Sequence, residues 1–349
     1  MNIKKVTVLC SELRDCKRIL KQYGHLMKTG NYWLFPSRCA MVVKQDDKIE
    51  IASRYFNAKG RNKKLDRLLS YINRSKYFCN KCKDSQELYE AFYLSNNYDK
   101  VREAKLFSFD RQKILTICVS PEERAAQLEQ YQRFHEAYSL PQITEYEAIP
   151  TAFEISMVQI LPIPSEKDAL GAIAASTVKY NENEMAELQK SSVAELIRFD
   201  YENREMNELL SELASKIDET LLDLPIPLCI QHGDLSKDNL MYGTSDGRTA
   251  FWWIDWEHAR ERIFFYDFFF YALHSAVYKD TSEALECYLR GENESEVRAY
   301  FEAFGVPYDA NKAKDYFLVF AIVFLKERVC DLNNLSALKM YCDVLRRLG

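Results

Sequence analysis

The stretch IQHGDLSKDNL at residues 230–240 and the stretch FWWIDWEH at residues 251–258 decide the fold of this chain. Each begins with or follows a short apolar run, and such runs are typical of buried strands. Each predicted strand, Leu228–Gln231 and Ala250–Ile254, therefore ends next to an acidic residue, which is Asp234 in the first case and Asp255 in the second. Acids that follow two neighbouring strands can meet at one place in the fold.

These residue types suit the transfer of a phosphoryl group. That reaction needs a positioned hydroxyl, a group that accepts its proton and a divalent cation on the phosphates. Magnesium prefers oxygen ligands, and Asn239 and Asp255 offer them from two predicted loops. Asp234 precedes Asn239 by five positions, so it can face an incoming hydroxyl from the same turn. We predict Asp234 as the catalytic base and Asn239 and Asp255 as the metal ligands.

The motifs resemble those of a known superfamily. HGDLSKDNL at 232–240, IDWE at 254–257 and YDF at 266–268 resemble the catalytic loop and metal segment of aminoglycoside phosphotransferases and choline kinases. The resemblance implies a protein-kinase-like fold, ATP and Mg²⁺ as cofactors, and the roles above for Asp234, Asn239 and Asp255. It also implies that Asp267 steadies the catalytic loop through its backbone.

The resemblance implies an α+β, bilobal architecture. We expect an amino-terminal α+β extension of unknown role at 1–95, a small mixed β lobe at 96–161 and a mostly helical catalytic lobe at 162–349. ATP would lie between the lobes, with the strand at 155–161 as the hinge. The local pattern predicts strands at 31–35, 40–44, 104–109, 113–119, 145–148 and 153–161, a helix that starts after Ser120, and helices over most of 167–222.

One position departs from the family pattern. The family places a lysine on the third strand of the small lobe, where this chain has Thr116. Lys113 or Lys105 could replace it, with Glu123 or Glu129 as the partner acid. Strand periodicity puts Lys113 and Thr116 on opposite faces of the sheet.

A glycine-rich phosphate loop is also missing, because no glycine lies between Gly60 and Gly171. The predicted function is an ATP- and magnesium-dependent phosphotransferase that acts on a hydroxyl group of a small molecule, such as a sugar, an amino alcohol or a glycan intermediate. One alternative is a pseudokinase that binds nucleotide, or serves as a scaffold, without turnover. A protein kinase is a second alternative, but such enzymes carry an arginine where this chain has Gly233.

The composition favours a cytoplasmic globular protein. The 47 Lys and Arg residues against 52 Asp and Glu give a net charge of −5, which does not favour nucleic acid as a partner. The ten cysteines are scattered and no secretion signal is visible, so we expect reduced thiols. The apolar runs at 264–273 and 316–325 are too short to cross a bilayer, so no transmembrane segment is expected. The sequence does not indicate an oligomeric state.

Several other residues have two interpretations. We expect His232 to fix the turn by packing and hydrogen bonding, while Lys237 and Glu257 are equally compatible with a site role or with solvent. Cys79 and Cys82 lack further zinc ligands at matching spacing, and the basic run at 61–67 is typical of a solvated helix face. The aromatic residues at 264–270 are predicted to be core.

Overall fold

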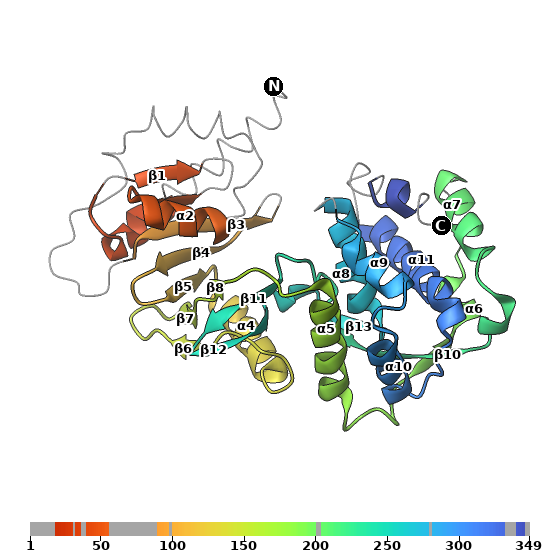
Figure 1. The fold of residues 1–349 in the computed structure, drawn as a ribbon. Coiled ribbons are helices and arrows are strands. Elements are labelled where there is room, and N and C mark those ends of the chain that lie inside the picture. The colour runs from red at the N-terminus through yellow and green to blue at the C-terminus, as the bar shows by residue number, and fades with distance from the viewer. Residues whose placement is uncertain are drawn as a thin grey trace. The chain divides into compact units, whose positions relative to one another are not determined.

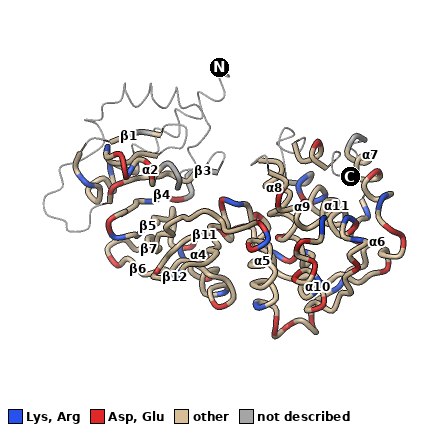
Figure 2. The backbone as a smooth tube through the Cα atoms, in the orientation of Figure 1, with Lys and Arg blue, Asp and Glu red and all other residues tan. Residues whose placement is uncertain are grey.

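The computed structural model describes residues 18–30, 32–35, 40–55, 89–97, 100–199, 204–278, 281–331 and 340–345. Contacts divide the chain into two compact units (Figure 1). The first consists of Met1–Gln132 and Pro141–Val158, and the second of Arg133–Leu140 and Gln159–Gly349. Acidic and basic residues are interspersed along both units, as expected from their similar numbers in the sequence (Figure 2). Cys79, Cys82 and the basic run at 61–67 lie outside the described residues.

A seven-stranded antiparallel sheet forms the first unit, in the order β1-β2-β3-β4-β5-β7-β6. Strands from the predicted extension at 1–95 and from the predicted small lobe lie side by side in this one sheet. The three-part division of the chain stays a prediction. The strands are β1 (Tyr32–Phe35), β2 (Ala40–Val43), β3 (Ala91–Asn97), β4 (Lys100–Ser108), β5 (Lys113–Cys118), β6 (Ile143–Glu145) and β7 (Ala152–Ser156).

Among the residues that the structure describes in this unit, two α-helices accompany the sheet, α2 (Asp46–Tyr55) and α4 (Pro121–Phe134). The predicted start of α4 is confirmed. Ser120 Oγ accepts a hydrogen bond from the Glu123 backbone nitrogen at 3.3 Å, and Glu123 Oε2 accepts one from the Val119 nitrogen at 3.2 Å. These bonds satisfy amide groups that the first helical turn leaves without partners.

Two small sheets and a set of helices form the second unit, in the strand orders β13-β10-β9 and β12-β11-β8. The hairpin between β11 and β12 turns at Asp246 and Gly247, whose φ angles are 49° and 73°. Asp-Gly suits this turn because both positions need a left-handed backbone. The strands are β8 (Gln159–Ile160), β9 (Lys190–Ser192), β10 (Pro225–Gln231), β11 (Leu240–Ser245), β12 (Arg248–Trp253) and β13 (Arg260–Ile263).

Helices α8 and α11 form the core of the second unit. Their apolar runs are buried, as predicted for 264–273 and 316–325, and rings such as Phe269 and Phe320 are completely inaccessible to solvent. Among the described residues, no helix combines the length and hydrophobicity needed to cross a bilayer. The helices are α5 (Glu166–Asn181), α6 (Val193–Ile197), α7 (Arg204–Ala214), α8 (Tyr266–Tyr278), α9 (Glu283–Leu289), α10 (Glu294–Ala303) and α11 (Ala313–Asp331), with short 3-10 turns between some of them.

The predicted α+β class is confirmed, but three local predictions were wrong. The strand predicted at 145–148 ends at Glu145, and a turn follows. The predicted helical region 167–222 is interrupted by β9, whose three residues pair with Pro225–Pro227 of β10. The strand predicted at 153–161 is divided into β7 and β8, which belong to different sheets. In addition, strand β11 was not predicted. A strand as short as β9 is set by pairing with distant residues, which local periodicity does not report.

Candidate active site

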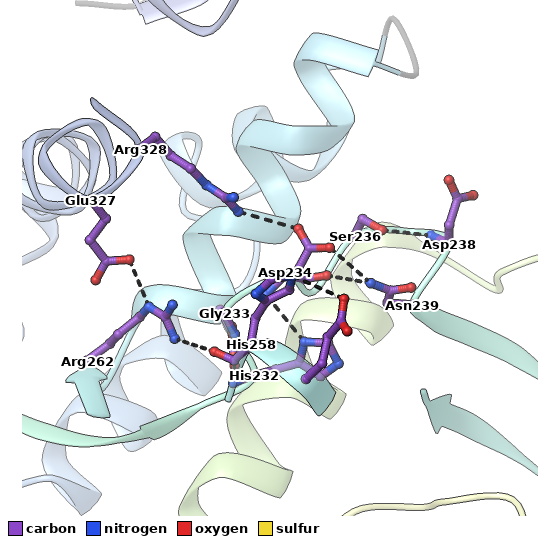
Figure 3. Close-up of polar contacts among 12 residues, drawn as sticks. His232, Gly233, Asp234, Ser236, Asp238, Asn239, His258, Arg262, Glu327 and Arg328 are labelled. Carbon is purple, nitrogen blue, oxygen red and sulfur yellow. Dashed lines mark hydrogen bonds and ion pairs between the residues drawn. The ribbon is translucent and has the colours of Figure 1, made fainter. Parts of the chain in front are cut away.

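The loop between β10 and β11 carries the predicted base and one predicted metal ligand (Figure 3). It folds into consecutive turns, because Ser236 N donates to Asp234 O at 2.8 Å and Asn239 N donates to Ser236 O at 3.0 Å. Leu240 N also donates to Ser236 O, at 2.9 Å. The turns therefore bring Asp234 and Asn239 back to the same side of the loop.

Asp267 at the start of α8 holds the beginning of this loop. Its carboxylate accepts hydrogen bonds from His232 N at 2.6 Å and from Gly233 N at 2.8 Å, and its own nitrogen donates to Gln231 Oε1 at 3.1 Å. Burial raises the pKa of Asp267, while the charge of nearby groups and the two amide donors oppose that rise. The expected contact of Asp267 with the backbone of this loop is confirmed.

His232 is a structural residue, as the sequence suggested. The buried ring joins two segments: its Nε2 lies 2.8 Å from Ile254 O, and its Nδ1 accepts from Asp234 N at 3.3 Å. The tautomer that carries its proton on Nε2 satisfies both contacts. The ring also lies 4.7 Å from the Trp256 ring, centroid to centroid. His232 thus links the loop after β10 to the segment after β12.

Asn239 and Asp234 are in direct contact. Asn239 Nδ2 donates to Asp234 O at 2.8 Å and lies 3.4 Å from Asp234 Oδ2. Because the amide nitrogen faces Asp234, the amide oxygen of Asn239 points away from it and is available to a cation. The side chain of Asp234 is 37% exposed. Partial burial raises the pKa of Asp234, and the nearby Arg328 opposes that rise.

Asp255 lies next to the same loop. Leu240 pairs with Trp253 in the β11–β12 hairpin, and Ile254 N donates to Asn239 O at 3.1 Å. The exposed carboxylate of Asp255 is near enough for its charge to raise the pKa of Asp234. The structure therefore brings the three predicted site residues to one end of the hairpin.

The backbone of Asp255 is unusual. Its φ and ψ angles are 67° and 63°, a left-handed conformation that costs an ordinary residue about 1–3 kcal/mol. The other two described residues of this kind outside glycine, Gln112 and Asp246, lie in hairpin turns, whereas Asp255 follows a strand and precedes a 3-10 turn. Strain of this kind is common at functional sites. The left-handed backbone at Asp255 ends the extended conformation of strand β12, so the Asp255 side chain does not follow the alternation of the strand.

The site offers oxygen ligands that fit Mg²⁺. The Asn239 amide oxygen and the Asp255 carboxylate are both hard donors, and Mg²⁺ is usually held by one or two such groups together with phosphate oxygens and water. The described residues contain no cluster of three or more His, Cys, Asp or Glu side chains around one point. A cation here would therefore take its remaining ligands from a nucleotide and from solvent.

Arg262, which no motif in the sequence indicated, supports the loop from β13. A methyl group at Gly233, where φ is 82°, would lie 2.3 Å from Arg262 Nη1, so the guanidinium would have to move to admit any side chain there. Arg262 Nε donates to Glu327 Oε2 at 2.9 Å and Nη1 donates to His258 O at 3.0 Å. The guanidinium thus occupies the space that a side chain at position 233 would need.

Lys237, which had two interpretations, forms a partly buried ion pair with Glu166. The side chains are 15% and 11% exposed, and Glu166 also accepts a hydrogen bond from Tyr271 Oη at 3.1 Å. These contacts join the catalytic loop to the first turn of α5 and to α8. A structural role accounts for Lys237. Glu257 is exposed, and its Oε1 lies 3.4 Å from His258 Nε2.

In the first unit, the register resolves the position of the two candidate lysines. Lys105 on β4 pairs with Thr116 on β5, so their side chains share one face of the sheet. Lys105 Nζ lies 2.6 Å from Glu103 Oε1. Lys113 donates instead to Ser156 Oγ at 2.8 Å. Glu103 is thus one acid partner of Lys105, while Glu123 of α4 caps its own helix and Glu129 is exposed.

Comparisons with known proteins agree with the motifs. A family model described as "Phosphotransferase enzyme family" matches residues 95–304, which is more than half of the chain. This range contains Asp234, Asn239, Asp255 and Asp267 but not Arg328. No curated protein matches the sequence at a significant level.

The chain is also similar to several solved structures, at low identity. Choline kinase LicA from Streptococcus pneumoniae is 14% identical, with 72% of this chain and 91% of that chain covered and a TM-score of 0.39. Macrolide 2'-phosphotransferase type I is 16% identical, with coverages of 72% and 90% and a TM-score of 0.40. Aminoglycoside phosphotransferase APH(4)-Ia is 13% identical, with coverages of 74% and 93% and a TM-score of 0.40.

Proposed function

The chain belongs to the phosphotransferase enzyme family, as its motifs predicted, and from this premise we propose that it transfers the γ-phosphoryl group of ATP to a hydroxyl group of a small molecule. The acceptor class is a sugar, an amino alcohol or a glycan intermediate, and the reaction takes place in the cytoplasm with Mg²⁺ as cofactor. One observation carries this proposal: Asp234, Asn239 and Asp255 meet at one end of the β11–β12 hairpin.

In this proposal each of the three residues has one task. Asp234 orients the acceptor hydroxyl and takes its proton as the new oxygen–phosphorus bond forms and the bond to the leaving ADP breaks. Asn239 and Asp255 hold the cation, which when bound neutralises charge on the phosphates. Asp267 and His232 keep the loop in place by the backbone contacts described above. Positioning and charge stabilisation then supply most of the rate enhancement.

We assign the nucleotide-binding lysine to Lys105. Its register opposite Thr116 puts an ammonium group on the face of the sheet where the family pattern places one, and Glu103 holds that group. Lys113 extends from the opposite face and is bound to Ser156. Lys105→Met should therefore raise the KM for ATP about tenfold or more, while Lys113→Met, the matched control, should leave it near the wild-type value. Equal effects of the two variants would reject the assignment.

The experiment that tests the proposed function measures ADP release in the presence of Mg·ATP and a panel of hydroxyl acceptors. Asp234→Asn keeps the shape of the side chain but removes the carboxylate base, so acceptor-dependent turnover should fall about 10²- to 10⁴-fold. Asp238→Asn makes the same change at an exposed position in the same loop and should retain activity. Similar turnover by Asp234→Asn and wild type would show that Asp234 is not the base.

The buried Thr116 at the expected lysine position favours one alternative, a pseudokinase. The two functions differ in nucleotide binding and in turnover. A ligand at a hundred times its dissociation constant adds about 2.7 kcal/mol to the free energy of unfolding, which a thermal-shift assay detects. A stabilising shift with Mg·ATP together with acceptor-dependent turnover supports the enzyme. A shift without turnover on any acceptor supports the pseudokinase.

A further inference from the structure

The two carboxylate oxygens of Asp234 face different partners. Oδ2 lies 3.4 Å from Asn239 Nδ2, and Oδ1 lies 3.5 Å from Arg328 Nη2 on α11. Figure 3 shows Asn239 and Arg328 approaching Asp234 from opposite sides. In the proposed function, Asn239 marks the side of the cation and the nucleotide. Arg328 therefore marks the other side of the base, where an acceptor hydroxyl has to arrive.

Arg328 is held in position mainly by aromatic rings. Its guanidinium lies 5.7 Å from the Phe270 centroid and 5.6 Å from the Phe324 centroid. Rings of this kind attract the cation through their faces but accept few of its N–H groups. The only ionic contact that Arg328 makes with the described residues is the one to Asp234, which at 3.5 Å is at the outer limit of a hydrogen bond.

The neighbouring Arg262 shows the contrast. Its Nε and Nη1 groups donate to Glu327 and to His258 O at 2.9 and 3.0 Å, and its side chain is only 5% exposed. Arg262 is thus a satisfied structural cation. Arg328, with 23% of its side chain exposed, keeps most of its five N–H donors for a partner outside the described residues.

A guanidinium next to the proposed base favours acceptors that carry a negative charge. The planar fork of arginine matches the geometry of a phosphate or carboxylate group, which it can bind through two parallel hydrogen bonds. An ammonium group on the acceptor would instead be repelled at this short distance. An anionic group can bind the edge of the guanidinium that faces away from Asp234, which also keeps it apart from the carboxylate of the base.

We propose that Arg328 binds a phosphate or carboxylate group of the acceptor, so that the acceptor is an anionic hydroxyl compound such as a sugar phosphate or a sugar acid, and not an amino alcohol. This inference rests on the proposed function and narrows its acceptor class. It does not follow from the family match, because Arg328 lies beyond the matched residues 95–304.

The test compares acceptors that differ in charge on one sugar frame: glucose, glucosamine, glucose 6-phosphate and glucuronate. Turnover is measured as kcat/KM with saturating Mg·ATP, and binding as a thermal shift in the presence of Mg·ADP. We expect the anionic compounds to be preferred in at least one of the two measurements. Arg328→Met retains an aliphatic stem over the two rings but should reduce kcat/KM for the anionic compounds about 10- to 100-fold, as expected for lost charge-assisted hydrogen bonds.

Two further variants separate recognition from folding. Arg328→Lys keeps the positive charge and should retain part of the preference for anions. Arg260→Met removes a neighbouring arginine that is 51% exposed and bound to Glu327, and should leave the preference unchanged. The affinity of each variant for Mg·ADP should equal that of the wild type, because Arg328 lies on the side of Asp234 away from Asn239.

The outcomes distinguish this inference from the proposed function. Anion-dependent thermal shifts that Arg328→Met abolishes, with no turnover of any compound, would reject the proposed function and retain anion recognition. Turnover that favours glucose or glucosamine would retain the proposed function and overturn the inference. The inference is also overturned if neither anionic compound is bound or turned over, or if Arg328→Met weakens Mg·ADP binding while it leaves the acceptor preference intact.

Discussion

The carboxylate of Asp267 lies 2.6 Å from the backbone nitrogen of His232 and so joins helix α8 to the loop that carries Asp234. The same carboxylate accepts from Gly233 N at 2.8 Å, and the contact is buried. A buried carboxylate with two amide donors fixes the direction of a loop far more tightly than one exposed hydrogen bond, because breaking it leaves three polar groups without water.

The first prediction concerns this contact. Asp267→Asn keeps the shape of the side chain but turns one acceptor into an NH₂ group that faces a backbone N–H. We expect the free energy of unfolding to fall by about 1–3 kcal/mol, measured by urea denaturation, because a buried donor is left unsatisfied. Asp223→Asn makes the same change at an exposed position and should be neutral. Equal stability of the two variants would mean that the loop does not depend on the Asp267 carboxylate.

The second prediction separates two reasons for glycine at position 233. Gly233→Ala must accept both a left-handed backbone, with φ of 82°, and a contact of 2.3 Å with Arg262 Nη1. Gly305→Ala is the matched control, because φ is 69° there and no atom lies within 4 Å of the added methyl group. We expect Gly305→Ala to lose about 1–2 kcal/mol from backbone strain alone.

Gly233→Ala should lose measurably more stability than Gly305→Ala, since Arg262 has to move away from Glu327 and His258. Urea denaturation of the two variants gives the difference directly. If both variants lose the same amount, the contact with Arg262 relaxes without cost and only the backbone conformation requires glycine.

The third prediction concerns Asp255 as a proposed metal ligand. Asp255→Asn removes a negative oxygen donor, and asparagine tolerates the left-handed backbone that this position requires. We expect the Mg²⁺ concentration for half-maximal activity to rise about tenfold or more, since Mg²⁺ binds a carboxylate better than an amide. Asp246→Asn is the control: it makes the same change at another left-handed position, in the β11–β12 turn. An unchanged Mg²⁺ requirement in Asp255→Asn would exclude Asp255 as a ligand.

The fourth prediction concerns the ion pair of Lys237 and Glu166. A double-mutant cycle with Lys237→Met and Glu166→Gln should give a coupling energy of about 1–3 kcal/mol, because both side chains are largely buried. The exposed pair of Lys216 and Glu212, one helical turn apart, should couple by only about 0.3–0.5 kcal/mol. If the coupling energy of the first pair is no larger than that of the second, the ion pair of Lys237 does not stabilise the loop.

The candidate site could be predicted from the motifs because its residues lie close together in the sequence. Asp234 and Asn239 lie in one loop, and Asp255 follows the adjacent hairpin, so spacing alone placed them together. The start of α4 at Ser120 was predicted for the same reason, since a helix cap depends on residues that are close in the chain. Strand β9 was missed because it is defined by its pairing with β10.

The sequence by itself determined the family, the α+β class, the buried aromatic helices and the residues from which a site could be built. The family follows from the resemblance of the motifs, and the other features follow from residue type and short-range spacing, which act through hydrophobic burial and local hydrogen bonds. Only the tertiary structure decided that Arg262 fills the space beside Gly233, that Lys105 pairs with Thr116, and that Arg328 reaches Asp234 from α11. Such contacts depend on how distant elements pack, and no local pattern of residues specifies that packing.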